Sequence, residues 1–551
     1  MRIARVLLTF LAAHTSARTT RRPNSSALSP NAQDLFHWSM HIQDNRYDAS
    51  YNFIQYSDKG IWSVRFTAWY LAGLLYRNEG DDVKHAEASI RNILACQMTA
   101  DFDAPWYGTF KLSPDQPDPT PDSMLYPPKI YTSYDPNWRE FIGSQLIQIV
   151  EEFEHLLPAT LVASIEDSLE IAAIGGMRRN GTFPQDDNLT TGYSNPAMMR
   201  ALVVGWIGAR RNNSTFIDFA NDQGTKILEL FQHNGADTLS EYNAPTYYGI
   251  DMWALGAQIK YGPKNSSMTT AAHYILPVLW QDLADHFNGY LGNTVGPYDR
   301  AYTRDATLHS TVLSLFLWGL WGQTTTPQPP KTEGDLLFDV AQGASIALII
   351  DTIAPLIPTN VPQAFLPSSP SLSEPRLLTK SIYDDISHAP RIATSWISKH
   401  LMIGGMSLNE TKNRGDQFVP AIVHWAGDQR RKPHPLNTFF SLYPSASAIH
   451  AVVSPNHMSI SYPNRTQQGA DIFTFAVSNV PPSWMLGTGR RIEGLEDLPC
   501  VAISVEAEGL QKQNVTYGEA LRNHLFYNIS YVVPEEFKGV PRIELDIRYT
   551  C

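Results

Sequence analysis

Apolar residues between about residue 34 and residue 352 recur three to four positions apart, and strand-like alternation is scarce there. Trp62, Phe66, Trp69 and Leu74, for instance, lie near one stripe of a helix. The pattern predicts paired helices at 62–76, 83–97, 138–157, 161–173, 196–209, 216–231, 245–259, 269–287, 306–321 and 336–350. Repeated antiparallel pairs are typical of an α/α toroid, and no fixed-period repeat favours the alternative, a solenoid.

The pattern changes after a Pro- and Ser-rich stretch at 355–375. The segments that follow are short, rich in β-formers and bounded by turn residues, which indicates antiparallel strands. They lie at 391–403, 417–424, 457–462, 472–478, 501–507 and 543–549. We therefore expect an α+β protein with an N-terminal α/α toroid domain at 34–352, a Pro-rich linker at 353–380 and a C-terminal antiparallel β-sandwich domain at 381–551.

The first residues are typical of a secretory signal peptide, which we place at 1–17. Arg2 and Arg5 precede an apolar run at 6–13, and the small residues Ser16 and Ala17 end the segment. The run is far shorter than the roughly 20 apolar residues that cross a bilayer. We expect a secreted protein that has no membrane partner.

Sequons for N-glycosylation support the secretory interpretation, because an acceptor Asn is glycosylated only in a chain that enters that pathway. Ten sequons are more than chance would place in a chain of this length. They begin at Asn24, Asn180, Asn188, Asn212, Asn213, Asn265, Asn409, Asn464, Asn514 and Asn528.

Three cysteines are too few for a disulfide scaffold, so core burial must stabilise the fold. A bridge between Cys500 and Cys551 would tie down the C-terminus, while Cys96 lies on an apolar helix face. The net charge of -12 and the lack of a Lys/Arg cluster argue against a nucleic-acid partner. We expect a monomer. We also expect no metal or cofactor, because neither paired metal-ligand spacing nor a Gly-rich nucleotide motif is present.

Three loop segments, at 190–196, 239–251 and 296–305, combine polar and aromatic residues more densely than core packing explains. Each also has a plain structural interpretation. In the first, Ser194 or Asn195 caps a helix that begins at Pro196. The second crowds a carboxylate, an amide and three phenols into a few residues, and the third carries two arginines one helical turn apart, which local Asp–Arg pairing would also explain.

These residue types fit β-elimination from a uronic-acid polysaccharide. A Tyr base needs a neighbouring cation for its phenolate, and Arg300 or Arg304 can supply it. Asn195 or Asn243 can hydrogen-bond a substrate carboxylate and stabilise the enolate-like charge that forms when the adjacent C–H proton leaves. The Tyr then protonates the departing glycosidic oxygen. Trp138, Tyr193, Tyr242, Asn243 and Tyr302 are the candidate substrate-binding residues.

The succession of the segment 137–143, the segment 191–195, the loop 241–248 and Arg300 with Arg304 resembles the chondroitin AC/hyaluronate/xanthan lyase group. The resemblance is distant and implies an incomplete α/α toroid followed by antiparallel β domains. It places Asn195 where that group has a carboxylate-neutralising Asn. It also places Tyr247 or Tyr248 at the catalytic Tyr, and Arg300 or Arg304 at the active-site Arg.

One position departs from the pattern of that group. Where the group has a catalytic His, this sequence has Glu241 or Tyr242. A carboxylate would repel a uronate there, unless the carboxylate is protonated or binds a different sugar group. The resemblance therefore supports the fold better than the reaction.

Three other functions remain open from the sequence. A glycoside hydrolase needs two opposed carboxylates, which Glu241 and Asp251 with Asp186 or Asp187 can supply. A toroid lined with aromatic residues can also stabilise a cation in a cyclase, isomerase or dehydratase of a small metabolite. A non-catalytic glycan-binding protein is the fourth class.

Overall fold

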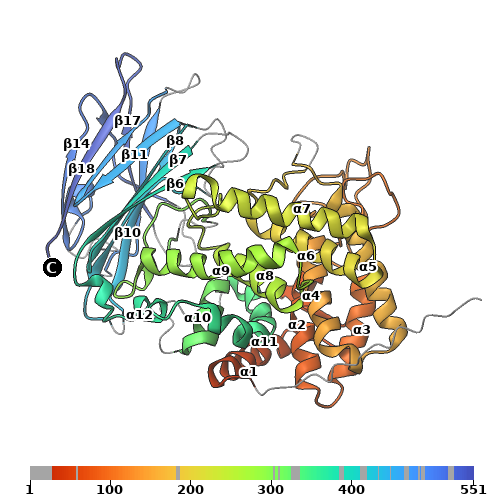
Figure 1. The fold of residues 1–551 in the computed structure, drawn as a ribbon. Coiled ribbons are helices and arrows are strands. Elements are labelled where there is room, and N and C mark those ends of the chain that lie inside the picture. The colour runs from red at the N-terminus through yellow and green to blue at the C-terminus, as the bar shows by residue number, and fades with distance from the viewer. Residues whose placement is uncertain are drawn as a thin grey trace, which may run out of the picture.

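The computed structural model describes residues 28–551 except 58–59, 182–186, 302–304, 308–310, 324–334, 384–389, 410–417, 432–433, 447, 465–470, 482–483, 485–490 and 519–525. The segment expected to be a signal peptide, 1–17, lies outside the described residues. Figure 1 shows a helical domain with the strands of a second domain packed at one end of it.

Five helices of the N-terminal domain form a closed inner ring, because each packs against the next and the last returns to the first. They are α2 (Val64–Arg77), α4 (Trp138–Phe153), α6 (Ser194–Arg211), α8 (Tyr248–Tyr261) and α11 (Gly343–Ile353). Most residues of α6 and α8 are buried on all sides, as helices enclosed by neighbours require. This is the predicted α/α toroid.

The outer helices bury one face each against the ring. They are α3 (Asp82–Ala95), α5 (Ala159–Met177), α7 (Ser214–Phe231) and α9 (Ser267–His286). Beside α11 lie α1 (Pro30–Asp44) and α10 (Thr311–Trp321), and α12 (Val361–Ala364) packs on α9. Asn213 and Ser266 cap α7 and α9, where their side chains accept backbone N–H groups that have no partner within the helix.

The C-terminal domain consists of antiparallel strands in two layers. One layer contains β6 (Arg376–Tyr383), β7 (Pro390–Ile397), β8 (Leu401–Asn409), β9 (Ala421–Asp428), β10 (Leu436–Pro444), β13 (Ile472–Ser478) and β17 (Tyr527–Val532), with the short β15 (Gln511–Lys512) and β16 (Thr516–Tyr517) on β17. The other contains β11 (Ala448–Ser454), β12 (His457–Ser461), β18 (Arg542–Tyr549) and β14 (Val501–Glu506). The start of β11 pairs with the end of β8 and joins the layers.

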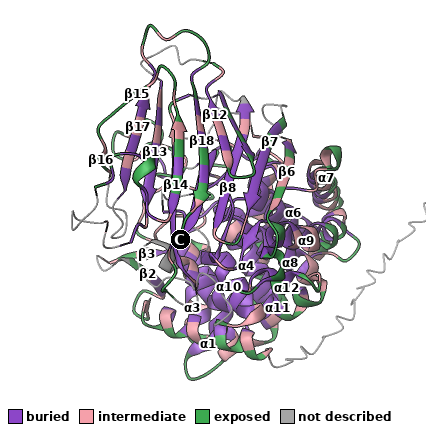
Figure 2. Cartoon of the chain, turned by 90° about the vertical axis from the view of Figure 1, so that its left-hand side faces the viewer, coloured by how far each residue is buried: buried purple, intermediate pink, exposed green. Residues whose placement is uncertain are grey.

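The layer that contains β7 to β10 is buried on both faces: β9 and β10 are buried along most of their length, and β7 and β8 are largely purple in Figure 2. One face packs against the second layer, where Trp425 and Phe440 lie in the sandwich core. The opposite face packs on loops of the helical domain, where Ile422 and Phe439 meet Tyr298. A strand with two buried faces reads as a continuous apolar run rather than an alternating one.

Contact between the domains is close at the backbone level. Tyr298 and Val419 form an antiparallel bridge. A Cβ atom on Gly404 would lie only 2.0 Å from the carbonyl oxygen of Gly296, so this position has no room for any side chain. The sheet therefore fixes the loop around residues 296–300 directly.

The structure confirms the predicted fold class, a helical toroid followed by an antiparallel β domain. Several elements lie outside the prediction. Helix α1 was not expected as a separate element, nor was the small sheet of β1 (Tyr47–Asp48), β2 (Phe53–Ser57) and β3 (Ile61–Ser63), nor the pair β4 (Phe287–Asn288) and β5 (Asn293–Thr294). The first strand of the β domain, β6, begins at Arg376, within the segment expected to be linker.

One helical segment among the described residues, Asp339–Leu356, is long and apolar enough to cross a membrane by length and composition. Its mean hydropathy is 1.3, and 67% of it is buried inside the protein. It contributes Ile346, Ile349 and Ile350 to the helical core. A core helix of this kind passes the same test without a membrane.

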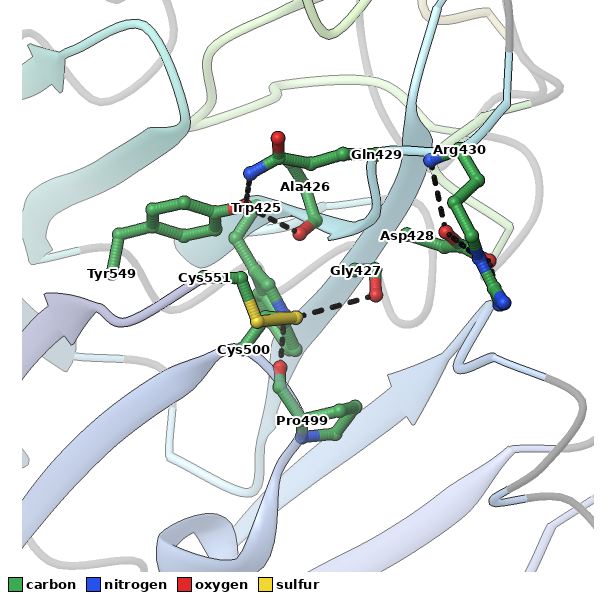
Figure 3. The surroundings of a disulfide bond; sticks show 10 residues. All are labelled: Trp425, Ala426, Gly427, Asp428, Gln429, Arg430, Pro499, Cys500, Tyr549 and Cys551. Atoms are coloured by element: carbon green, nitrogen blue, oxygen red, sulfur yellow. Dashed lines mark hydrogen bonds and ion pairs between the residues drawn. A yellow bond between two sulfur atoms is a disulfide. The ribbon is translucent and has the colours of Figure 1, made fainter.

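The Cys500–Cys551 disulfide is present and holds the C-terminal residue beside strand β9 (Figure 3). Close to it, the Trp425 indole donates to the carbonyl of Pro499 at 2.8 Å. Cys96 is a buried free thiol, as expected.

We expect the double variant Cys500→Ser/Cys551→Ser to lose up to about 4 kcal/mol of unfolding free energy, because the bridge closes a loop with a sequence separation of 51 residues. Chemical denaturation with and without reductant measures this loss. Reductant should destabilise the wild-type protein and leave the double variant unchanged. Equal reductant sensitivity of the two proteins would contradict the assigned role of the bridge.

Candidate active site

Three inner helices begin at the same place, and the residues that precede them contact one another. Asn137, Tyr193 and Tyr247 occupy the N-cap positions of α4, α6 and α8. Asn137 Nδ2 donates to Tyr193 Oη at 3.1 Å, and the rings of Tyr193 and Tyr247 stack at 6.2 Å. Each helix N-terminus carries partial positive charge, so this end of the toroid favours anions.

Glu241 lies at the centre of this group and is 3% exposed. Its Oε2 accepts hydrogen bonds from the backbone N–H and from the hydroxyl of Ser194, both at 3.0 Å. Its Oε1 lies 3.0 Å from Nη2 of Arg300, which is also buried. The segments 190–196, 239–251 and 296–305 therefore meet at one carboxyl group.

Burial raises the pKa of Glu241 to about 7, with a further contribution from the charge of Asp299. The Arg300 guanidinium and the two Ser194 donors oppose this rise. A carboxyl with a pKa near neutrality can both accept and donate a proton under physiological conditions. Proton transfer is the chemistry that Glu241 is best suited to.

A second carboxyl group lies beside Glu241. Asp251, in the first turn of α8, is fully buried, and neither of its oxygens has a hydrogen-bond partner of normal geometry among the described residues. Burial, and then the charge of Glu241, raise its pKa well above the usual range, although the nearby Ser194 hydroxyl lowers it slightly. Burial therefore favours the neutral form of Asp251 over its carboxylate.

Arg300 also approaches the aromatic part of the site. Its guanidinium carbon lies 5.8 Å from the centre of the Tyr247 ring, and the hydroxyl of Thr246 donates to its backbone carbonyl at 3.3 Å. Tyr247 is 8% exposed. A permanent cation is thus held next to a phenol that has some access to solvent.

The other members of the loop 239–251 hold loops together. Tyr248 Oη accepts the backbone N–H of Asn243 at 2.7 Å. Asn243 Nδ2 donates to the carbonyls of Val295 and Pro297 at 2.6 Å and 2.8 Å. Tyr242 Oη lies 2.6 Å from Nε2 of His286. The geometry therefore distinguishes the adjacent tyrosines: Tyr247 lies near Arg300, and Tyr248 bonds within its own loop.

Asn195 follows Ser194 in the first turn of α6 and is 2% exposed. Its Nδ2 has no hydrogen-bond partner among the described residues. A buried amide donor without a partner costs free energy unless a ligand or water satisfies it.

Trp138 begins α4, and its ring lies 5.6 Å from the guanidinium carbon of Arg65. Tyr302 and Arg304 lie outside the described residues.

Sequence reasoning missed a second buried charge cluster next to Asn137. Arg179 donates to Asn137 Oδ1 at 2.9 Å and to Asp187 Oδ1 at 3.1 Å, and it lies 3.5 Å from Glu140. Burial raises the pKa of Glu140 and lowers that of Arg200 to about 10, so the guanidinium keeps its charge at neutral pH. Glu140 lies in the segment 137–143 that the sequence analysis singled out. Its partners Arg179 and Arg200 lie far from it in the sequence, so composition alone does not reveal the cluster.

The sequons occupy varied positions. Asn180, Asn212, Asn265, Asn464 and Asn514 are exposed, and Asn188, Asn213 and Asn528 are partly buried. Beside the site, Asn188 Nδ2 donates a hydrogen bond to the Tyr131 hydroxyl at 2.8 Å. Asn24, the side chain of Asn409 and Asp186 lie outside the described residues, and Asp187 is bound to Arg179.

The chain belongs to the family described as Domain of unknown function (DUF8769), whose model matches residues 33–351. A second model, Domain of unknown function (DUF8770), matches residues 374–548. The two matches coincide with the toroid and the β domain. No curated protein matches the sequence.

Among solved structures, heparinase III matches with a TM-score of 0.45 and 9% identity, over 96% of this chain and 87% of its own. The chondroitin AC lyase of Streptomyces coelicolor A3, in complex with chondroitin sulphate, matches with a TM-score of 0.38 and 8% identity, over 95% and 80%. A glycoside hydrolase matches with a TM-score of 0.30 and 9% identity, over 94% and 75%. All three alignments span most of both chains, but their TM-scores lie below 0.5 and their identities below 10%, and no activity follows from them.

The high pKa of Glu241 predicts a pH-dependent stability. The carboxyl titrates near 7 when folded and near 4.5 in its reference state, so between these values the folded protein keeps a proton that the unfolded chain releases. Stability should fall by about 3 kcal/mol as the pH rises from 4.5 to 7, and Asp251 adds in the same direction.

Urea unfolding at several pH values measures this effect. In Glu241→Gln the decline should be weaker, whereas the loss of the ion pair with Arg300 should lower its stability where the wild-type carboxyl is ionised. Parallel stability curves for the two proteins across pH 4.5 to 7 would show that Glu241 titrates normally.

Proposed function

We propose that this protein is a secreted carbohydrate-active enzyme that cleaves a uronic-acid-containing polysaccharide by β-elimination. The observation that carries the proposal is the buried pair of Glu241 and Arg300, at 3.0 Å, placed beside Tyr247 where three helices begin. It joins a carboxyl that titrates near neutrality, a cation and a phenol in one place.

The local charge fits an anionic substrate in spite of the net charge of -12. Arg179, Arg200 and Arg300 are buried around the site. Several carboxyl groups that would offset them have raised pKa values, including Glu140 and Asp251. The helix N-termini add partial positive charge. The charge around the site is therefore more positive than it would be if all of these carboxyl groups were ionised.

The same shift removes the objection that a carboxylate at position 241 would repel a uronate. With a pKa of about 7, Glu241 is protonated in a large share of molecules near neutral pH, and a bound uronate carboxylate would raise that share further. A protonated Glu241 donates a hydrogen bond instead of repelling the substrate.

In the proposed reaction, Asn195 Nδ2 and Arg300 bind the carboxylate of the uronate and stabilise the charge that forms when the adjacent proton leaves. Tyr247, next to the Arg300 cation, takes the proton from C5. The C4–O bond breaks, a C4=C5 double bond forms, and a proton from Glu241 or from Tyr247 completes the leaving hydroxyl. The products are one chain with a new reducing end and one chain that begins with an unsaturated uronate.

Glycoside hydrolysis is the competing carbohydrate reaction. It needs two carboxyls on opposite sides of the scissile bond. Asp251 is fully buried and interacts with the same Ser194 as Glu241, which places both groups on one side. The geometry therefore favours elimination over hydrolysis.

Incubation with a panel of polyuronates tests the reaction class. We expect ultraviolet absorbance from unsaturated ends to increase with time. New reducing ends without absorbance would replace elimination by hydrolysis, and silence in both assays would favour the small-metabolite enzyme or the glycan-binding protein.

Substitution of the two adjacent tyrosines tests the site. Tyr247→Phe should lower kcat about 100-fold or more, because general acid–base groups contribute this much. Tyr248→Phe is the matched control: it removes the same hydroxyl group one residue away and breaks the bond from Asn243 N–H, so it should mainly lower stability. Steady-state kinetics and thermal unfolding of both variants separate the effects. A larger kcat loss in Tyr248→Phe would exchange their roles.

Secretion and glycosylation make a separate test. The protein from a eukaryotic secretory host should lose mass on treatment with a peptide N-glycosidase, with exposed Asn212, Asn265 and Asn514 occupied. An unchanged mass would remove the support that the sequons give to secretion.

A further inference from the structure

Strand β7 presents every second residue to the two loops that carry the charged pair of the candidate site. Arg391, Ala393 and Ser395 share one face, because successive side chains of a strand alternate. Ala393 packs in a buried cluster with Tyr242, and Ser395 Oγ donates to the carbonyl of Gly296 at 2.7 Å. The sheet thus contacts both loops through one row of side chains.

Arg391 holds the two loops together. It is 4% exposed, its Nη1 lies 2.5 Å from Asp299 Oδ1, and its Nη2 donates to the carbonyl of Ser240. Ser240 directly precedes Glu241, and Asp299 directly precedes Arg300. The guanidinium of Arg391 therefore binds both loops. In each loop it contacts the residue that directly precedes Glu241 or Arg300.

We propose that Arg391, a residue of the β domain, is a positioning residue for the candidate active site, because it fixes the spacing between Glu241 and Arg300. The inference rests on the proposed function only in what the pair does with substrate. The planar guanidinium suits this role, since it can donate two bonds in fixed directions, and an ammonium group cannot reproduce that geometry.

Arg391 also neutralises a charge that acts on Glu241. The groups that face Glu241 are Arg300 and Asp299 from one loop, Ser194 and Tyr193 from the start of α6, and Asp251 from α8. Among these, Asp299 raises the pKa of Glu241. Removal of the Arg391 cation takes away the ion-pair partner of Asp299, so the charge of Asp299 acts more strongly on Glu241 and the pKa of Glu241 should rise further.

Two substitutions separate the geometric and the electrostatic effect. Arg391→Lys keeps the charge and loses the double contact, so kcat should fall about tenfold while the pH profile stays in place. Arg391→Met loses both, so the limb of the kcat profile that Glu241 controls should also move to higher pH, by on the order of one unit. The direction is the same whether Glu241 acts as acid or as base.

Arg376→Met is the matched control. Arg376 also reaches from the β domain to the helical domain, where it donates to the backbone carbonyls of Asp285 and Phe287. These partners lie outside the loops that hold the charged pair. This variant should lose stability at the domain interface without moving the pH profile. The double variant Arg391→Met/Asp299→Asn should return the profile toward its wild-type position, because it also removes the charge of Asp299.

Difference infrared spectroscopy provides a readout that does not need activity. The C=O stretch of protonated Glu241, identified by its loss in Glu241→Gln, reports the titration of the carboxyl directly. An unmoved titration in Arg391→Met overturns the electrostatic role, and an unchanged kcat in Arg391→Lys overturns the positioning role. If Arg391→Met does not fold, Arg391→Lys decides the proposal alone. A wild-type protein that forms no unsaturated ends refutes the proposed function, while the infrared titration still tests Arg391.

Discussion

Two opposite charges, Glu241 and Arg300, are removed from water and held 3.0 Å apart in the middle of this molecule. A buried ion pair recovers the cost of its desolvation only when its geometry is good and further hydrogen bonds satisfy it. Here Ser194 supplies two donors from the start of α6. Even so, burial outweighs these partners and leaves the pKa of Glu241 at about 7. In the proposed reaction, this incomplete compensation would allow Glu241 to transfer a proton near neutral pH.

Neither domain alone can provide that environment. The helical ring brings the starts of α4, α6 and α8 together, but the loops that carry Glu241 and Arg300 leave the ring and lie against the sheet. The sheet can cover them only because β7 to β10 bury both faces, one in the sandwich and one on the loops. A Cβ-free position at Gly404 allows the backbones to touch. Docking of the domains is therefore part of the construction of the site.

The sequence predicted most of the elements in which apolar residues recur at a regular spacing. Outer helices with a continuous apolar stripe, such as α3 and α7, were expected within a few residues of their observed bounds. Strand β6 was taken for linker because it follows a Pro-rich stretch, and its alternating half-exposed residues give a weak signal. Strand β10 was missed since burial on both faces erases the alternation that distinguishes a strand.

The candidate site divides in the same way. Loop composition selected the three segments that meet at Glu241, because dense polar and aromatic residues at helix starts are a local signal. It could not separate Tyr247 from Tyr248, which differ only in the direction of their side chains. Arg391 was beyond reach, since its partners Ser240 and Asp299 precede it by about 150 and 90 residues and only the docked sheet unites them.

The departure at position 241 shows why residue type alone is a poor guide to charge. A His with an ordinary pKa near 6.5 and a Glu with an ordinary pKa near 4.5 differ at neutral pH, yet burial moves Glu241 to about 7. Desolvation thus gives a carboxyl the proton affinity of an imidazole. The difference that remains is the sign of the charge: an imidazole becomes a cation on protonation, whereas Glu241 becomes neutral. A site built on Glu241 must take its positive charge from elsewhere, and Arg300 and the helix N-termini lie where that charge is required.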